Sequence, residues 1–153
     1  MLSEAATALR TLALALWVGG GAALDFVEAP LRFAGGVLDR NQAVGLGQAV
    51  FGRWVRVEWA LGVIVLATFA GSKGPSWLAW LIVLMLAAVT VQGAYLAPAI
   101  VRLSTGLDFV HRTPGDPRYA AIRPLHTASV LCEIVVLLAG AVALVYTVRS
   151  ARR

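Results

Sequence analysis

The chain has 153 residues, of which 59% are hydrophobic and only 14% are charged. Soluble domains carry about 25% charged residues, so this composition argues against a soluble protein and predicts an all-α integral membrane protein. The formal net charge of +5 does not indicate a nucleic-acid partner, because the arginines stand at the ends of apolar runs and form no basic stripe. A single cysteine, Cys132, excludes an intrachain disulfide and a cysteine-rich metal site.

Four apolar runs predict four membrane spans, at about residues 7–30, 50–71, 76–100 and 121–148. Consecutive spans alternate in direction, so the sequence predicts an antiparallel four-helix bundle that forms a single domain over residues 1–153. The first run is long enough to be a retained span, not a signal peptide, because its apolar residues continue through Phe26 and Val27.

Local signals mark where these helices begin and pack. Small residues at Gly19–Gly21 predict a face where a second helix approaches closely, and Pro30 predicts a stop or kink. Asp39 and Gln42 have the spacing of a capping box, so the second helix should begin near Arg40. Its uninterrupted apolar part, residues 59–70, is short, and it crosses a bilayer only if residues 50–58 enter as well.

The later helices have their own boundary signals. Residues 71–75 have the composition of a tight turn, so the third span should begin at Ser76. Asp116 and Pro117 predict an N-cap and first position for the fourth helix, which Pro124 should kink.

Charge counts give a prediction of orientation. With both termini on one side, eight of the 13 arginines and lysines lie on the side of the first and third loops, and the other five lie on the terminal side. The positive-inside rule therefore places these two loops in the cytoplasm, and we expect a bacterial cytoplasmic membrane.

Polar side chains gather in the loop-side half of the four runs, whereas the terminal halves hold no group that titrates near neutrality. This asymmetry predicts a polar pocket that is open to the loop side and closed by an apolar plug on the terminal side. The candidate ligand-binding residues are Asp25, Glu28, Arg53, Arg56, Glu58, Gln92, Tyr95, Arg102, His126 and Glu133.

The centre of this pocket is predicted at His126 and Glu133, which are seven residues apart and so share one helix face. A carboxylate deep in a bilayer is costly, so Glu133 is a functional-site hypothesis. His126, Glu133 and Glu58 would be mixed nitrogen and oxygen ligands, a set that suits a divalent metal such as zinc, iron or manganese.

Other chemistries remain open for the same residues. His126 and Glu133 could exchange protons in a relay, and His126 could be one axial ligand of a haem that lacks an evident second ligand. Arg53, Arg56 and Arg102 could hold a carboxylate or a phosphate. No nucleophile, triad or phosphate loop is visible, so an enzyme is the weakest class. We expect a protein that binds or passes a small solute, either a metal ion or a proton.

A structural interpretation competes with these. Asp25 and Glu28 could pair with Arg53 and Arg56, and Gln92 could form an interhelical hydrogen bond. The chain would then be an accessory subunit of a larger membrane complex, or would form a homo-oligomer, and its partners would be the bilayer and other protein chains.

Four segments resemble a known family: LWVGGGAALDFVEAPLRF, VFGRWVRVEWALG, QGAYLAPAI and LHTASVLCE. They are similar to the uncharacterised four-span membrane family that includes the human transmembrane protein linked to platinum-drug resistance. More distantly, the glycine-rich first span resembles the copper-resistance membrane domain and the HemJ-type protoporphyrinogen oxidases. The near resemblance implies a four-helix bundle, and the distant one implies a haem or metal role through intramembrane histidines, although the first span has no histidine.

Overall fold

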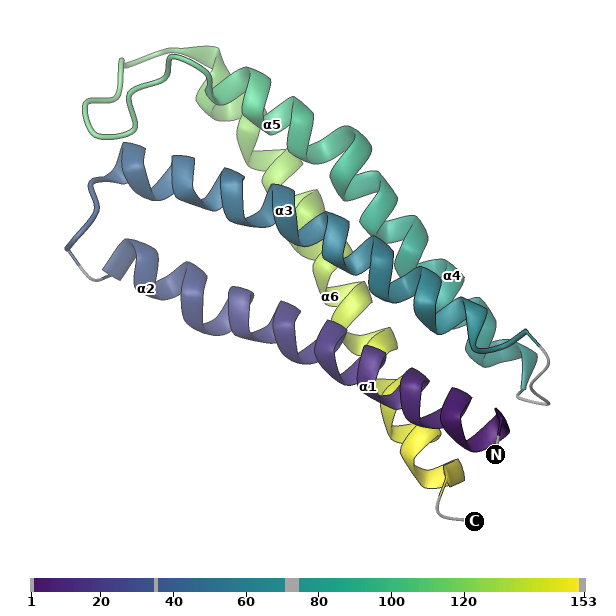
Figure 1. The fold of residues 1–153 in the computed structure, drawn as a ribbon. Helices are drawn as coiled ribbons and strands as arrows, with labels where there is room; N and C mark the ends of the chain where they lie inside the picture. Colours follow the sequence, from purple (N-terminus) through teal and green to yellow (C-terminus); the bar gives the residue numbers. More distant parts are fainter. Residues whose placement is uncertain (1, 35, 71–74, 152–153) are drawn as a thin grey trace.

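The computed structural model describes residues 2–34, 36–70 and 75–151, which form four long helical segments and no strand in these ranges (Figure 1). Their bounds are α1 (Leu2–Ala23), the π-helix η1 (Leu24–Glu28) and α2 (Ala29–Ala34) for the first; α3 (Arg40–Ala67) for the second; α4 (Ser76–Val91), the π-helix η2 (Gln92–Leu96) and α5 (Ala97–Ser104) for the third; and α6 (Pro117–Ala151) for the fourth.

Neighbouring segments run in opposite directions. Among contacting residues, the numbers rise along one segment while those of their partners fall along the next. The first and second segments show this in the pairs Arg10–Thr68, Trp17–Glu58 and Arg32–Ala43. The third and fourth show it in the pairs Trp77–Tyr146 and Gln92–Ser129. Both termini therefore lie at one end of the molecule, which we call the terminal end, and the connections into α3 and α6 lie at the other, the loop end (Figure 1).

Three of the helices are long and apolar enough to cross a membrane, at Glu4–Ala34, Ser76–Ser104 and Pro117–Ala151. The prediction of an all-helical integral membrane protein is supported at this level. The predicted span 50–71 falls on α3, which does not meet the same criteria because Arg53, Arg56 and Glu58 interrupt its apolar sequence.

The predicted start of the second helix is confirmed by its capping geometry. The Gln42 N–H donates to Asp39 Oδ1 at 2.8 Å, and Gln42 Oε1 accepts from the Asp39 N–H at 3.0 Å. The fourth helix begins at Pro117 as predicted and continues through Pro124. The predicted turn at residues 71–75 lies mostly outside the described residues.

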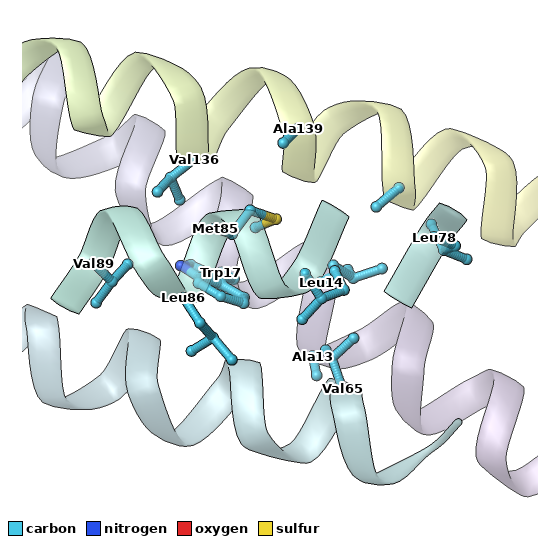
Figure 2. Packing of buried hydrophobic residues seen from close by; sticks show 12 residues of the cluster. Ala13, Leu14, Trp17, Val65, Leu78, Met85, Leu86, Val89, Val136 and Ala139 are labelled. Carbon is cyan, nitrogen blue, oxygen red and sulfur yellow. The ribbon is translucent and has the colours of Figure 1, made fainter. Parts of the chain in front are cut away.

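The apolar core occupies the terminal half of the molecule. Figure 2 shows its side chains meeting from all four segments around Trp17, which is fully buried. The cluster consists of Ala13, Leu14, Trp17, Val65, Leu78, Ile82, Met85, Leu86, Val89, Val136, Ala139 and Ala143. This is the region in which the sequence predicts an apolar plug.

Both π-helices end two residues before a proline. Glu28 precedes Pro30, and Leu96 precedes Pro98. Proline lacks an N–H and clashes with the carbonyl four residues earlier, which an α-helix cannot accommodate without distortion. Here each helix widens by one residue, since the Ala29 N–H donates to the Leu24 carbonyl and the Ala97 N–H donates to the Gln92 carbonyl. The helix therefore continues past Pro30 to Ala34, where the sequence alone indicated a stop or a kink.

Arg32 fastens α2 to α3 near the loop end. Its side chain is buried, and it donates to Glu28 Oε2 at 2.6 Å and to the Ala43 carbonyl at 3.4 Å. The guanidinium lies directly over Gly47, so a larger residue there would require the Arg32 side chain to move from its buried position. The absence of a side chain at Gly47 thus allows a buried arginine between two helices.

Replacing Gly47 with alanine tests whether the buried Arg32 side chain holds α2 against α3. A Cβ there would collide with the Arg32 guanidinium. We expect Gly47→Ala to lower the free energy of unfolding by about 1–3 kcal/mol, the usual cost of overpacking, seen as a lower melting temperature in detergent. Gly45→Ala is the control, because a Cβ there meets nothing within 4 Å and alanine favours helix. Equal melting temperatures for the two variants would show that the fit of Arg32 over Gly47 does not stabilise the packing of α2 on α3.

Asp108 ties the connection between α5 and α6 to the start of α3. Its Oδ1 accepts from Asn41 Nδ2 at 2.9 Å, from the Val110 N–H at 2.8 Å and from the His111 N–H at 3.0 Å. Asn41 Oδ1 in turn accepts from the Phe109 N–H at 2.6 Å. These hydrogen bonds, the one from the His111 N–H foremost, hold the pKa of Asp108 well below its usual range.

The lowered pKa of Asp108 determines how its contribution to stability depends on pH. Because the pKa of Asp108 is lower in the folded chain, its contribution to stability is complete above about pH 3.9 and is lost only as the pH falls through the lower folded value. We expect hydrogen-exchange protection at Val110 and His111, corrected for intrinsic rates, to be the same at pH 7 and pH 5. Asp108→Ala should remove this protection at both pH values. Thr113→Ala, a change at an exposed residue of the same loop, should leave the protection in place. Protection that survives in Asp108→Ala would show that the loop is held otherwise.

Candidate functional site

Two carboxyl side chains are buried in the interior next to the apolar core. Glu58 of α3 is 1% exposed and Glu133 of α6 is 6% exposed. Each has one oxygen in a hydrogen bond, since Trp17 Nε1 donates to Glu58 Oε1 at 3.0 Å and Gln92 Nε2 donates to Glu133 Oε2 at 3.3 Å. The second oxygens, Glu58 Oε2 and Glu133 Oε1, have no partner in the described part of the chain.

The glycines of α1 make room for this site. A Cβ on Gly20 would collide with the Trp54 indole, and a Cβ on Gly21 would stand 3.0 Å from Glu133 Oε1. The predicted packing face at Gly19–Gly21 thus receives Trp54 from α3 and Glu133 from α6, whereas Gly19 faces open space. Close approach of the three helices is what brings the two carboxyls together.

Further polar groups line the same interior. Asp25, in η1, is half-buried and lies close enough to Glu58 and Glu133 for the three carboxyls to interact electrostatically. Gln92, in η2, also donates to the Ser129 carbonyl at 3.0 Å and is 8% exposed. Two more buried polar atoms, Trp54 Nε1 and Gln92 Oε1, have no partner among the described residues. The site therefore holds more hydrogen-bonding groups than are satisfied.

The structure does not bring all the predicted residues to this site. Asp25, Glu58, Gln92 and Glu133 lie at it, whereas the remaining candidates do not. Those with exposed side chains are Arg53, Arg56, Tyr95, Arg102 and His126. Glu28 is half-buried and pairs with Arg32, so the expected pairing of Asp25 and Glu28 with Arg53 and Arg56 does not occur in the described part of the chain.

His126 is the main departure from the predicted geometry. It shares a helix face with Glu133, but near the loop end α6 packs against α5 and makes no contact with α2 in the described ranges. Figure 1 shows α6 lying by α5 and away from α2 at this end. Nothing from the first segment covers this part of α6, so His126 stays exposed.

A metal site is not evident in this geometry. Among the residues that the structure describes, no group of three or more His, Cys, Asp or Glu side chains is placed to hold a metal ion. The proposed set of His126, Glu133 and Glu58 is split between an exposed histidine and two buried carboxyls.

Two cavities, of about 620 and 270 Å³, lie at the terminal and loop ends, and none of the predicted residues lines them.

Sequence reasoning missed three residues around the carboxyls, of which Trp17 bonds to Glu58 directly. Trp17 and Trp54 read as packing or interface residues, but their indole N–H groups point to a polar interior. Ser129, which accepts from Gln92 Nε2 at 3.2 Å, carried no signal. A sequence signal for η1 and η2 does exist, because an Ala-Pro pair follows each of them directly.

Gly21→Ala tests the close approach of α1 and α6. The new Cβ would press on Glu133 Oε1 and would stand 3.3 Å from Leu137 Cδ2. We expect a loss of about 1–3 kcal/mol in the free energy of unfolding and a change in tryptophan fluorescence, because Trp54 Nε1 lies within 3.9 Å of the same position. Gly19→Ala, which adds a Cβ in open space, should change neither. If both variants behave alike, Gly21 does not set the carboxyl geometry.

Comparison with known protein families gives a match over most of the chain. Residues 12–106 match a family described as Domain of unknown function (DUF4149). This range extends from the middle of α1 to the end of α5 and includes Trp17, Asp25, Glu58 and Gln92, but not Glu133. No curated protein and no solved structure matches the chain. The prediction of an uncharacterised membrane family is thereby supported.

Proposed function

We propose that this chain, which belongs to the DUF4149 family, binds a proton between Glu58 and Glu133 and exchanges it with the loop end of the molecule. The proposal makes the protein a carrier or relay for a small cation, not an enzyme. It assumes that all four helical segments cross the membrane as an antiparallel bundle, with one face of α3 packed against the first and third segments.

The observation that carries the proposal is a pair of buried carboxyls, each with an unpartnered oxygen. An unpaired charge in a low-dielectric interior is very costly, and two neighbouring carboxylates repel each other. No arginine, lysine or histidine of the described chain bonds to either group. A proton on one or both carboxyls removes the charge and supplies an O–H donor for an acceptor such as Gln92 Oε1.

A proton fits this site better than a metal ion does. Divalent metals require several ligands converging on one point, and the described residues offer no such group. A proton requires only one carboxyl oxygen and one acceptor, and the buried atoms without partners in the described chain include both kinds of group: Glu58 Oε2, Glu133 Oε1 and Gln92 Oε1. Indole N–H donors, such as the one from Trp17 to Glu58, also suit a carboxyl that changes its charge during a proton-transfer cycle.

Access from the loop end follows from the position of the remaining acids. Asp25 and Glu28 lie along η1 between the buried pair and the loop end, and both are only half-buried. In the other direction, the apolar core around Trp17 and Met85 separates the pair from the terminal end. Protons would thus reach Glu133 and Glu58 by way of Asp25. With cytoplasmic loops in a bacterial membrane, as the charge bias predicts, this path opens to the cytoplasm.

Infrared spectroscopy of the protein in lipid tests the proposal directly. We expect the wild type to show the band of a protonated carboxyl at neutral pH, and pH-difference spectra to change it reversibly. Glu58→Gln and Glu133→Gln should each remove part of the band while the fold persists, because an amide resembles a neutral carboxyl in size. Glu28→Gln, at a partly buried ion pair with Arg32, is the control and should leave the band unchanged.

Two other outcomes would decide against it. A wild type with no protonated carboxyl, and with bound metal by elemental analysis that Glu133→Gln abolishes, would restore the metal interpretation. A site that never titrates, combined with loss of folding in both glutamine variants, would favour the accessory-subunit interpretation, in which Glu58 and Glu133 serve only as interhelical hydrogen-bonding groups.

A further inference from the structure

Two arginines lie on the face of α3 that points away from the rest of the molecule. Arg53 and Arg56 are exposed, and they are three residues apart, so they are separated by about 60° around the helix. Glu58, which faces the interior, lies on the opposite side of α3. Neither arginine forms a hydrogen bond or an ion pair within the described part of the chain.

Their depth follows from the contacts of α3. Thr68 lies at the terminal end, where Arg10 contacts it and where Trp77 stacks edge-on against Tyr146 in the manner of an interfacial aromatic belt. At about 1.5 Å per residue, Arg56 and Arg53 are about 18 and 22 Å from Thr68 along the helix. With Thr68 placed at the terminal-side edge of a hydrocarbon layer about 30 Å thick, both arginines lie in the leaflet on the loop side.

The sequence of α3 gives these side chains a route to the lipid headgroups. Helical side chains lean towards the helix N-terminus and cover the positions three and four residues earlier. The N-terminus of α3 is at the loop end, so both arginines lean towards the nearer membrane surface. The positions four residues before them are Ala49 and Gly52, and a Cβ on Gly52 would meet nothing within 4 Å. The helix surface over Ala49 and Gly52, which lies beside the arginines and which we call the furrow, therefore carries at most a methyl group.

We propose that Arg53 and Arg56 hold the phosphate of an anionic phospholipid from the loop-side leaflet in the furrow over Ala49 and Gly52. Guanidinium groups bind phosphate through paired charge-assisted hydrogen bonds, and long cationic side chains extend from the hydrocarbon to reach such groups. The furrow lets the phosphate approach the helix backbone. This inference depends on α3 lying in the membrane, but not on protonation of the buried carboxyls.

The test is lipid binding to the purified full-length chain, measured by native mass spectrometry and by thermal shift in detergent. We expect phosphatidylglycerol to bind and stabilise the wild type more than phosphatidylcholine does. The double variant Arg53→Gln with Arg56→Gln should bind phosphatidylglycerol about 25-fold more weakly, about fivefold for each arginine. Arg112→Gln, in the connection between α5 and α6, is the control and should bind as the wild type does.

A second variant separates the furrow from the charges. Gly52→Leu keeps both arginines but fills the furrow, and it should also weaken phosphatidylglycerol binding without lowering the melting temperature of the lipid-free protein. Equal binding of phosphatidylglycerol to wild type and to the double variant would overturn the proposal. So would protection by inorganic phosphate alone that matches the lipid, or a wild-type dimer in detergent that the double variant converts to monomer, because a soluble anion or a second copy would then occupy this face.

Discussion

The constraint on which the structure depends is the placement of Glu58 and Glu133 in an interior with low dielectric constant. Such groups need hydrogen-bond donors, and the hydrocarbon of a bilayer provides none. The donors come from two other segments, Trp17 of α1 and Gln92 of η2. All four segments therefore meet at the pair, and the apolar core begins immediately beside it, because Trp17 belongs to both.

Close packing without bulky side chains makes this meeting possible. In a membrane, helices gain little from hydrophobic burial against one another, so small residues determine where they approach. Glu133 lies close against Gly21, Arg32 lies close against Gly47, and Val55 of α3 lies close against Gly93 of η2. The π-helices serve the same site, since Asp25 lies in one and Gln92 lies in the other. A widened turn before each proline places a polar residue at the level of the carboxyls, consistent with the frequent use of π-helices at functional sites.

Much of the fold could be predicted from the sequence, because apolar length, a capping box and an Asp-Pro helix start are local patterns. Asp39, Ser76 and Pro117 mark helix starts where the structure has them. The site was predictable in part. Glu133 and Glu58 stand out as charges inside apolar runs, but their partners depend on which helix faces which, as Trp17 shows. His126 was misplaced because a shared helix face indicates direction and not burial, and α6 is not covered by α2 at that level.

The two sides of α3 show why this helix fails the criteria for a membrane span that the other three segments meet. Its inner face carries Glu58, and its outer face carries Arg53 and Arg56, so charge interrupts its apolar sequence on both sides. These charges do not neutralise one another, since they point in opposite directions from one helix. In the two proposals above, each is balanced locally: the inner one by a proton and by indole or amide donors, the outer ones by the anionic groups of the surrounding lipid. A helix with this pattern stays in a membrane only when protein covers one face and headgroup phosphates can reach the other. In a bilayer, the same charges that weaken α3 as a span would thus fix its rotation about its own axis.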